Sequence, residues 1–205
     1  MRPLLVAVFG GLAIFVVAIS AFLLLRERPT PRPALGETRV IEDANLIGGP
    51  YVLTDETGNR FTDADALGKP TVIFFGFTFC PDVCPTTLYE LSVLLGQLGP
   101  DADRLNVLFV SVDWERDGPE EVAAYTSVFD PRIVGLAGTG EEIAAATSGY
   151  RVHYEKIPLE NGGYTIDHTA SVYLMDRNGR FVGTLAYGED MAVRLQKLQM
   201  LIADA

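Results

Sequence analysis

The stretch at residues 71–88 reads TVIFFGFTFCPDVCPTTL and holds both cysteines of the chain, Cys80 and Cys84. Its first part, residues 71–75, is β-branched and aromatic without a charge, which is typical of a strand buried on both faces. Pro85 favours the start of a helix, because proline is best tolerated in the first helical turn. The two cysteines are therefore predicted to lie at a strand-to-helix junction.

Thiols at such a junction are expected to be reactive or metal-binding. The partial positive charge of a helix N-terminus lowers a thiol pKa from about 8.5 into the range of roughly 3.5 to 7.5. Four helical residues separate two Cα atoms by about 6 Å, which permits either a disulfide or a shared soft metal ion. Buried structural cysteines are the alternative interpretation. The two prolines and Asp82 in this segment instead indicate a shaped loop.

Strand and helix patterns alternate along the chain around this junction. A predicted hairpin at 51–62 comes first, and a helix with a leucine stripe follows the cysteines and ends at Gly99 and Pro100. The pattern then predicts strands at 105–112, 133–136, 151–157, 169–175 and 180–186, and helices at 117–128, 139–149 and 189–202. Asp117 and Glu120 form a predicted capping box, and residues 158–167 are interpreted as a loop. This order predicts an α/β thioredoxin-like sandwich, a central mixed sheet with helices on both faces.

The N-terminal segment predicts a membrane anchor. Residues 4–25 carry no charge, and as a helix they would span about 33 Å against about 30 Å for a bilayer core. A cleaved signal peptide is the alternative, but the apolar run continues beyond the weak cleavage box at Ala18 to Ser20. We therefore expect an anchor at 1–28, an extended proline-rich linker at 29–44 and a thioredoxin-like domain at 45–205. The anchor is interpreted as a single pass through a bacterial inner membrane, with the domain in the periplasm.

Composition narrows the classes of partner. The formal net charge of −11 disfavours binding to nucleic acid, whose phosphates would be repelled. An acidic surface by itself is most often a solubility feature.

The chain contains two histidines, and they are expected to have different roles. His153 lies within the predicted strand 151–157 and is interpreted as structural. His168 lies where a thioredoxin carries its cis-proline, across the groove from the cysteine motif, so it could supply a nitrogen ligand beside two sulfurs. Two thiolates and one imidazole suit copper. Zinc is the competitor, but a structural zinc site normally has four cysteine or histidine ligands. Asp82 and Asp167 are candidates for an oxygen ligand or a neighbouring partner.

Three motifs together resemble a known family. They are CPDVCP at 80–85, Ser-Val-Asp at 111–113 followed by Glu-Arg-Asp at 115–117, and Asp-His at 167–168. The chain resembles the Sco/SenC family over about residues 45–203 and in its anchor. Trp114 departs from the pattern, since many members have proline there.

The resemblance implies a membrane-tethered copper protein that helps to assemble the dinuclear copper centre of cytochrome c oxidase subunit II. It implies Cys80, Cys84 and His168 as the copper ligands, for Cu(I), Cu(II) or both. Further partners would be a periplasmic copper chaperone or a thioredoxin-like reductant.

Two functions stay open from the sequence. One is copper delivery by ligand exchange, which is not catalysis in the strict sense. The other is a thiol-disulfide reductase, in which Cys80 and Cys84 cycle between dithiol and disulfide to keep the target cysteines reduced. Copper binding requires His168, whereas dithiol exchange does not. A peroxiredoxin-like peroxidase is disfavoured, because that class has threonine three residues before its cysteine, and Phe77 precedes Cys80 in that position.

Overall fold

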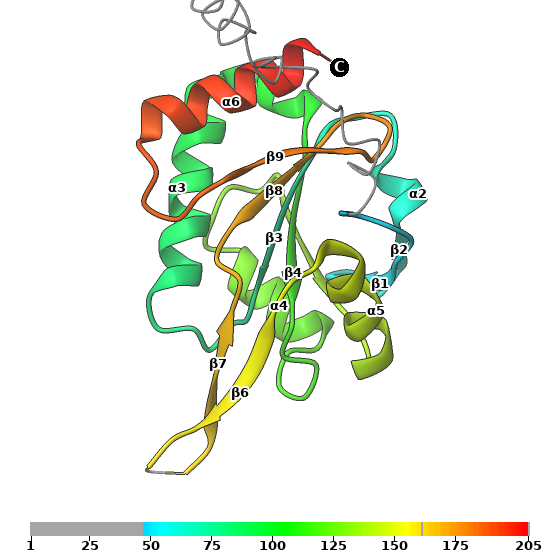
Figure 1. Ribbon diagram of the computed structural model, residues 1–205, viewed down its shortest axis with the longest axis vertical. Coiled ribbons are helices and arrows are strands. Elements are labelled where there is room, and N and C mark those ends of the chain that lie inside the picture. Colours follow the sequence, from blue (N-terminus) through cyan, green and yellow to red (C-terminus); the bar gives the residue numbers. More distant parts are fainter. Residues whose placement is uncertain (1–46, 161, 205) are drawn as a thin grey trace, which may run out of the picture. The chain divides into compact units, whose positions relative to one another are not determined.

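A seven-stranded sheet forms the centre of the computed structural model, which describes residues 47–160 and 162–204 (Figure 1). The strand order is β2-β1-β5-β4-β3-β8-β9. Strands β3, β4 and β5 are parallel, whereas β8 is antiparallel to β3 and β9 to β8. The strands span Val52–Asp55 (β1), Arg60–Thr62 (β2), Thr71–Gly76 (β3), Asn106–Ser111 (β4), Ile133–Ala137 (β5), Val172–Met175 (β8) and Phe181–Leu185 (β9).

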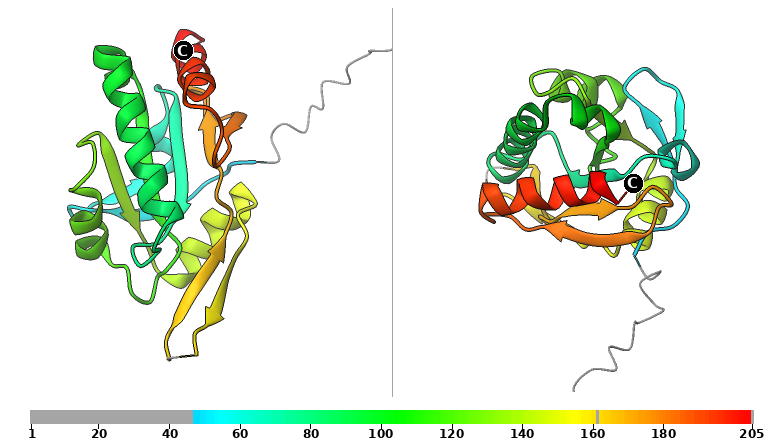
Figure 2. Two further views of the ribbon diagram at one scale, coloured as in Figure 1. Left: turned by 90° about the vertical axis from the view of Figure 1, so that its left-hand side faces the viewer. Right: turned by 90° about the horizontal axis from the view of Figure 1, so that it is seen from above.

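Helices cover both faces of this sheet. They span Asp63–Ala66 (α2), Val83–Leu98 (α3), Pro119–Thr126 (α4), Gly140–Tyr150 (α5) and Met191–Ala203 (α6), with a 3-10 helix at Gly99–Arg104 (η2). Figures 1 and 2 show α3 and α5 on opposite sides of β3 and β4. Helix α3 packs beside α6, and α4 packs on β5. This arrangement confirms the predicted mixed α/β sandwich of the thioredoxin type.

The core lies on both faces of β3 and β4, and α3 packs on one of these faces. Every residue of β3 is buried, as its uncharged sequence predicts. The predicted stripe on α3 is also confirmed, since its members are all buried: Leu88, Leu91, Leu94, Leu95 and Leu98. Burial of these side chains fixes α3 on the sheet and thereby fixes the position of its first turn.

A separate two-stranded hairpin, β6 (Tyr154–Pro158) and β7 (Tyr164–His168), extends from the main sheet (yellow to orange in Figure 1). Its strands are antiparallel, and Tyr154 pairs with His168 at the base. Two sequence-based expectations are wrong here. Residues 164–167 of the predicted loop 158–167 belong to strand β7, and His153 precedes β6 instead of lying in it. Apolar and polar residues do not alternate clearly in this segment. The sequence therefore predicts strand boundaries that differ by several residues from those of the structure.

The start of α4 also differs from the expectation. The helix begins at Pro119, and Glu121 accepts a hydrogen bond from the backbone N–H of Gly118 at 3.1 Å. Asp117 does not cap the helix; its side chain is buried.

The predicted anchor at 1–28 and linker at 29–44 lie outside the described residues. Within the part of the chain that the structure describes, no helix combines the length and the apolar character needed to cross a bilayer.

Candidate metal centre

The two cysteines lie just beyond the carboxyl end of β3. Cys80 lies in the connecting loop, and Cys84 lies in the first turn of α3. The backbone N–H of Cys84 points to the sulfur of Cys80 at 3.4 Å, so the loop curls back over the helix start. Both cysteines are free thiols. Cys84 is fully buried and Cys80 is partly exposed, which gives the pair one inner and one outer sulfur.

A glycine at the end of β3 makes room for the inner sulfur. A Cβ at Gly76 would meet Cys84 Sγ and Phe109 Cε2, each at 2.8 Å. Real Cβ atoms do not approach neighbours so closely, and therefore a side chain here would displace the sulfur or the ring.

The two thiols share one proton unequally. A hydrogen bond from the Cys84 thiol lowers the pKa of Cys80 to about 4, although partial burial opposes this shift. The same hydrogen bond raises the pKa of Cys84 above its usual value, and burial raises it further. At neutral pH Cys80 is therefore a thiolate and Cys84 keeps its proton. Thiolate is the form that binds metals and attacks disulfides.

His168 approaches the cysteines from the end of β7. Its Nε2 atom lies 3.4 Å from Cys84 Sγ, and its Nδ1 atom lies 3.1 Å from the carbonyl oxygen of Thr169. A carbonyl only accepts, so Nδ1 carries a proton, and in the neutral imidazole the Nε2 lone pair faces the sulfurs. The rings of Phe74 and Phe77 meet the imidazole edge to face, at centroid distances of 6.1 and 5.7 Å.

One ligand atom each from Cys80, Cys84 and His168 lies within 4.8 Å of the other two. Among residues 47–160 and 162–204, no other group of three such side chains comes this close. The structure thus brings together the three residues that the sequence singles out.

The other candidates stay apart from this cluster. Asp82 and Asp167 are exposed and do not join it, and side chains alternate along β7, so Asp167 faces away from His168. His153 is also exposed and outside the cluster.

Sequence reasoning missed a buried polar network beside the cysteines. Asp117 accepts hydrogen bonds from the backbone N–H and hydroxyl of Thr78, at 2.8 and 2.6 Å, and from the hydroxyl of Ser111 at 2.5 Å. Thr78 lies two positions before Cys80, so Asp117 fixes the loop that carries the outer sulfur. The available signal was the position of Asp117 soon after the uncharged strand β4. The neighbouring proline and glutamate instead led to its interpretation as a helix cap.

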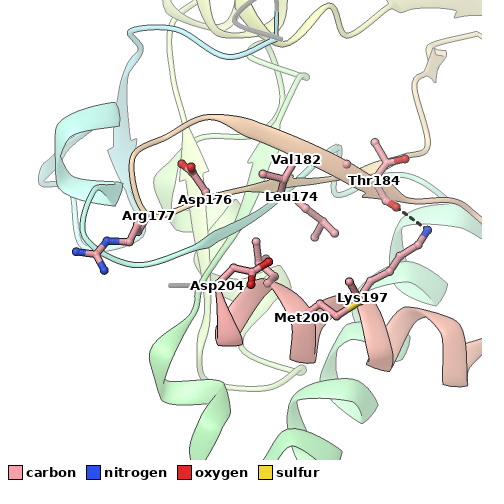
Figure 3. A pocket seen from close by; sticks show the side chains of 10 residues that line it. Leu174, Asp176, Arg177, Val182, Thr184, Lys197, Met200 and Asp204 are labelled. Carbon is pink, nitrogen blue, oxygen red and sulfur yellow. Dashed lines mark hydrogen bonds between the residues drawn. The ribbon is translucent and has the colours of Figure 1, made fainter. Parts of the chain in front are cut away.

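The structure also contains a hollow of about 350 Å³ between β8, β9 and α6 (Figure 3). Apolar side chains of Leu174, Val182 and Met200 line it, and Lys197 donates to the carbonyl oxygen of Thr184 at 3.0 Å. Met175 pairs with Thr71, so the hollow lies near the amino end of β3. The cysteines follow the opposite end, and this hollow is not part of the candidate metal centre.

Comparison with known proteins identifies the family. A family model described as SCO1/SenC matches residues 40–203. The chain belongs to the SCO1/SenC family. The human mitochondrial SCO1 homologue is 43% identical over 143 residues, covering 67% of this chain and 46% of that protein. Protein SenC of Rhodobacter capsulatus is 35% identical, covering 80% of this chain and 74% of that protein. The match therefore spans less than half the length of the human relative and most of the bacterial one.

Solved structures of SCO1/SenC proteins have the same fold. Bradyrhizobium japonicum ScoI with copper bound is 49% identical, with a TM-score of 0.71 over 76% of this chain and 99% of that chain. Yeast Sco1 with copper bound is 37% identical, with a TM-score of 0.71 over 78% and 90% of the two chains.

Proposed function

We propose that this SCO1/SenC protein binds one copper ion through Cys80, Cys84 and His168 and delivers it to the dinuclear copper centre of cytochrome c oxidase subunit II. The observation that carries the proposal is the convergence of two sulfurs and a ring nitrogen of His168 within 4.8 Å of one another. Copper-bound structures of relatives at 49% and 37% identity support the choice of metal.

The donor set itself fits copper. Soft thiolates favour Cu(I), and an imidazole extends the set toward Cu(II). Zinc fits less well, because a closed zinc site takes four ligands and the described residues offer three. An incoming metal would displace the Cys84 proton into solvent, and the two thiolates with a neutral imidazole would then carry two negative charges, enough to balance Cu(II).

The unequal exposure of the sulfurs suits transfer by ligand exchange. Cys80 is partly exposed and already a thiolate, so a partner's ligand can approach the copper beside it. Cys84 would bind the ion from the buried side of the site. Subunit II is the proposed recipient of the copper, and a periplasmic copper chaperone is the proposed donor. A thioredoxin-like reductant is the proposed partner that reduces a disulfide between Cys80 and Cys84. We further propose that residues 1–28 anchor the domain on the periplasmic side of a bacterial inner membrane.

Thiol-disulfide reduction is the less favoured function. Dithiol exchange uses the two sulfurs and their protonation states alone. It leaves the approach of His168 to Cys84, and the orientation of its lone pair, without a role.

The experiment that tests the proposal is copper transfer. Full-length chain loaded with copper is mixed with the copper-free soluble domain of subunit II, and the recipient's dinuclear-copper absorption is followed. We expect transfer from wild type and from His153→Ala, the matched control histidine, but little from His168→Ala. Equal transfer from both histidine variants would exclude the three-ligand delivery site.

A further inference from the structure

The hairpin β6–β7 has one face toward the body of the protein. Side chains alternate along a strand, so Tyr164, Ile166 and His168 lie on the same face of β7. Ile166 is buried, which shows that this face packs against the body. The hairpin is nevertheless a sheet of its own, without ladder hydrogen bonds to the seven-stranded sheet. Its position therefore depends on the short chain connection from His168 to β8 and on contacts outside the strand ladders.

The polar contacts that fix the hairpin centre on Tyr164, four residues before His168. Its hydroxyl donates to Asp113 Oδ1 at 2.6 Å, and its carbonyl oxygen accepts from Arg116 Nη1 at 3.0 Å. Arg116 Nε in turn donates to Asp113 Oδ2 at 2.5 Å. Asp113 is fully buried in the segment after β4, so this closed set of bonds ties β7 to the edge of the core. Hydrogen bonds to buried charged groups are among the stronger kind.

The same arginine also reaches the cysteine loop. Its guanidinium carbon lies 3.8 Å from the ring centroid of Tyr164 and 4.6 Å from that of Phe79. Phe79 is the residue before Cys80 and is 60% exposed, so packing in the core does not hold its ring. The contact with Arg116 holds it instead. Arg116 therefore contacts both elements that carry metal-ligand candidates: the loop with Cys80 and the strand with His168.

We propose that Asp113, Arg116 and Tyr164 form a brace that positions His168 over Cys80 and Cys84. Among the described residues, the hydrogen bonds and ring contacts of the brace do not include the sulfurs or the imidazole; the brace acts by fixing the hairpin relative to the cysteine loop. The consequence for copper rests on the proposed function above, whereas the consequence for the placement of His168 does not. Residues that orient metal ligands typically change metal affinity about 10- to 100-fold when they are altered.

The first test uses the metal-free full-length chain, so it does not depend on copper binding. NMR cross-peaks between the His168 ring and the Phe77 ring report the placement of the imidazole. We expect Tyr164→Ala to weaken or abolish these cross-peaks, and Tyr164→Phe to weaken them less, because the ring still stacks on Arg116. Tyr187→Ala is the matched control, since Tyr187 is an exposed tyrosine before α6. Unchanged cross-peaks in Tyr164→Ala would overturn the brace.

The second test separates positioning from general stability. Copper affinity is measured by competition titration in a double-mutant cycle with His168→Ala. We expect Tyr164→Ala to weaken binding about 10- to 100-fold in the wild-type background. It should change binding less than about twofold when His168 is already absent. Equal losses in the two backgrounds, or no loss in the first, would contradict a role through His168. Failure of wild type itself to bind copper would contradict the proposed function, while the NMR result still decides the brace.

Discussion

His168 Nε2 lies 3.4 Å from Cys84 Sγ, although 84 positions separate the two residues in the chain. One residue begins a helix that is fixed by a leucine-rich core, and the other ends a hairpin outside the main sheet. The contact therefore joins a rigid element to a separately attached one.

Copper binding is expected to need both sulfurs. Wild type should bind about one copper ion per chain, and the Cu(II) form should show a sulfur-to-copper charge-transfer band. Cys80→Ser and Cys84→Ser should each lose that band, because a hydroxyl is a poor ligand for soft copper. Metal analysis and visible spectroscopy measure both properties. Full copper retention in both serine variants would show that the site lies elsewhere.

Removal of His168 should separate metal chemistry from thiol chemistry. His168→Ala is expected to weaken copper binding more than the roughly 10- to 100-fold loss typical of residues that only orient ligands. The Cys80–Cys84 disulfide should still form and be reduced, because exchange needs only the sulfurs. Thiol titration measures disulfide formation and reduction, and competition titration measures copper affinity. His153→Ala is the control for both. Complementation of a strain lacking the protein by His168→Ala, as fully as by wild type, would favour the reductase.

The thiol pair should show a marked pH dependence in the metal-free protein. Because the pKa of Cys80 is about 4, alkylation of Cys80 by iodoacetamide should persist at pH 5, where an ordinary thiol is unreactive. The folded pKa lies below the unfolded one, so the contribution of Cys80 to stability is complete above about pH 9 and is lost as pH falls toward 4. Mass spectrometry of alkylated peptides measures the first effect. Cys80→Ser should lack the pH-dependent contribution in denaturant unfolding, and a titration midpoint near 8.5 would contradict the assignment.

Gly76 should tolerate no side chain. Gly76→Ala places a Cβ 2.8 Å from both Cys84 Sγ and Phe109 Cε2, and we expect the free energy of unfolding to fall by about 1–3 kcal/mol. Copper affinity should fall as well, because the inner sulfur moves. Gly96→Ala is the matched control on α3, where nothing lies within 4 Å of the added atom. That helical change should stabilise the protein by up to about 1 kcal/mol. Chemical denaturation of both variants compares the two, and equal stabilities would rule out the clash.

Asp117 should matter more than its supposed capping role implies. Asp117→Ala leaves the buried hydroxyl of Ser111 and the backbone N–H of Thr78 without their acceptor. Each unsatisfied buried group costs about 1–3 kcal/mol, so a fall of several kcal/mol in unfolding free energy is expected. Glu120→Ala, on the exposed surface, is the control and should change stability by less than about 0.5 kcal/mol. Denaturant unfolding of the two variants gives the comparison.

Periodic and uncharged segments were the predictable part of the fold. Burial is the one physical explanation for the leucine stripe of α3 and for the uncharged run of β3. Both segments could therefore be placed in the core from sequence alone. The position of the cysteines followed from these two elements. The convergence of His168 on them followed from the topology that the element order implies.

Polar side chains with distant partners were not predictable. Asp117, two positions before a proline, looks the same in sequence whether it caps a helix or binds Thr78, because only tertiary structure brings Thr78 to it. Tyr164 lies in a segment rich in glycine and polar residues, and nothing local indicates that its hydroxyl meets Asp113. Such contacts depend on side-chain geometry across elements, which residue spacing does not record.

The separate hairpin has a kinetic consequence. Local openings in proteins cost only the contacts of the segment that opens, and they can occur far more often than global unfolding. Because β6 and β7 pair only with each other, the hairpin can open and move His168 away from the cysteines while α3 and both sulfurs stay in place. If His168 binds the ion as proposed above, the residence time of the ion would follow the lifetime of the closed hairpin and could vary among homologues with the same melting temperature.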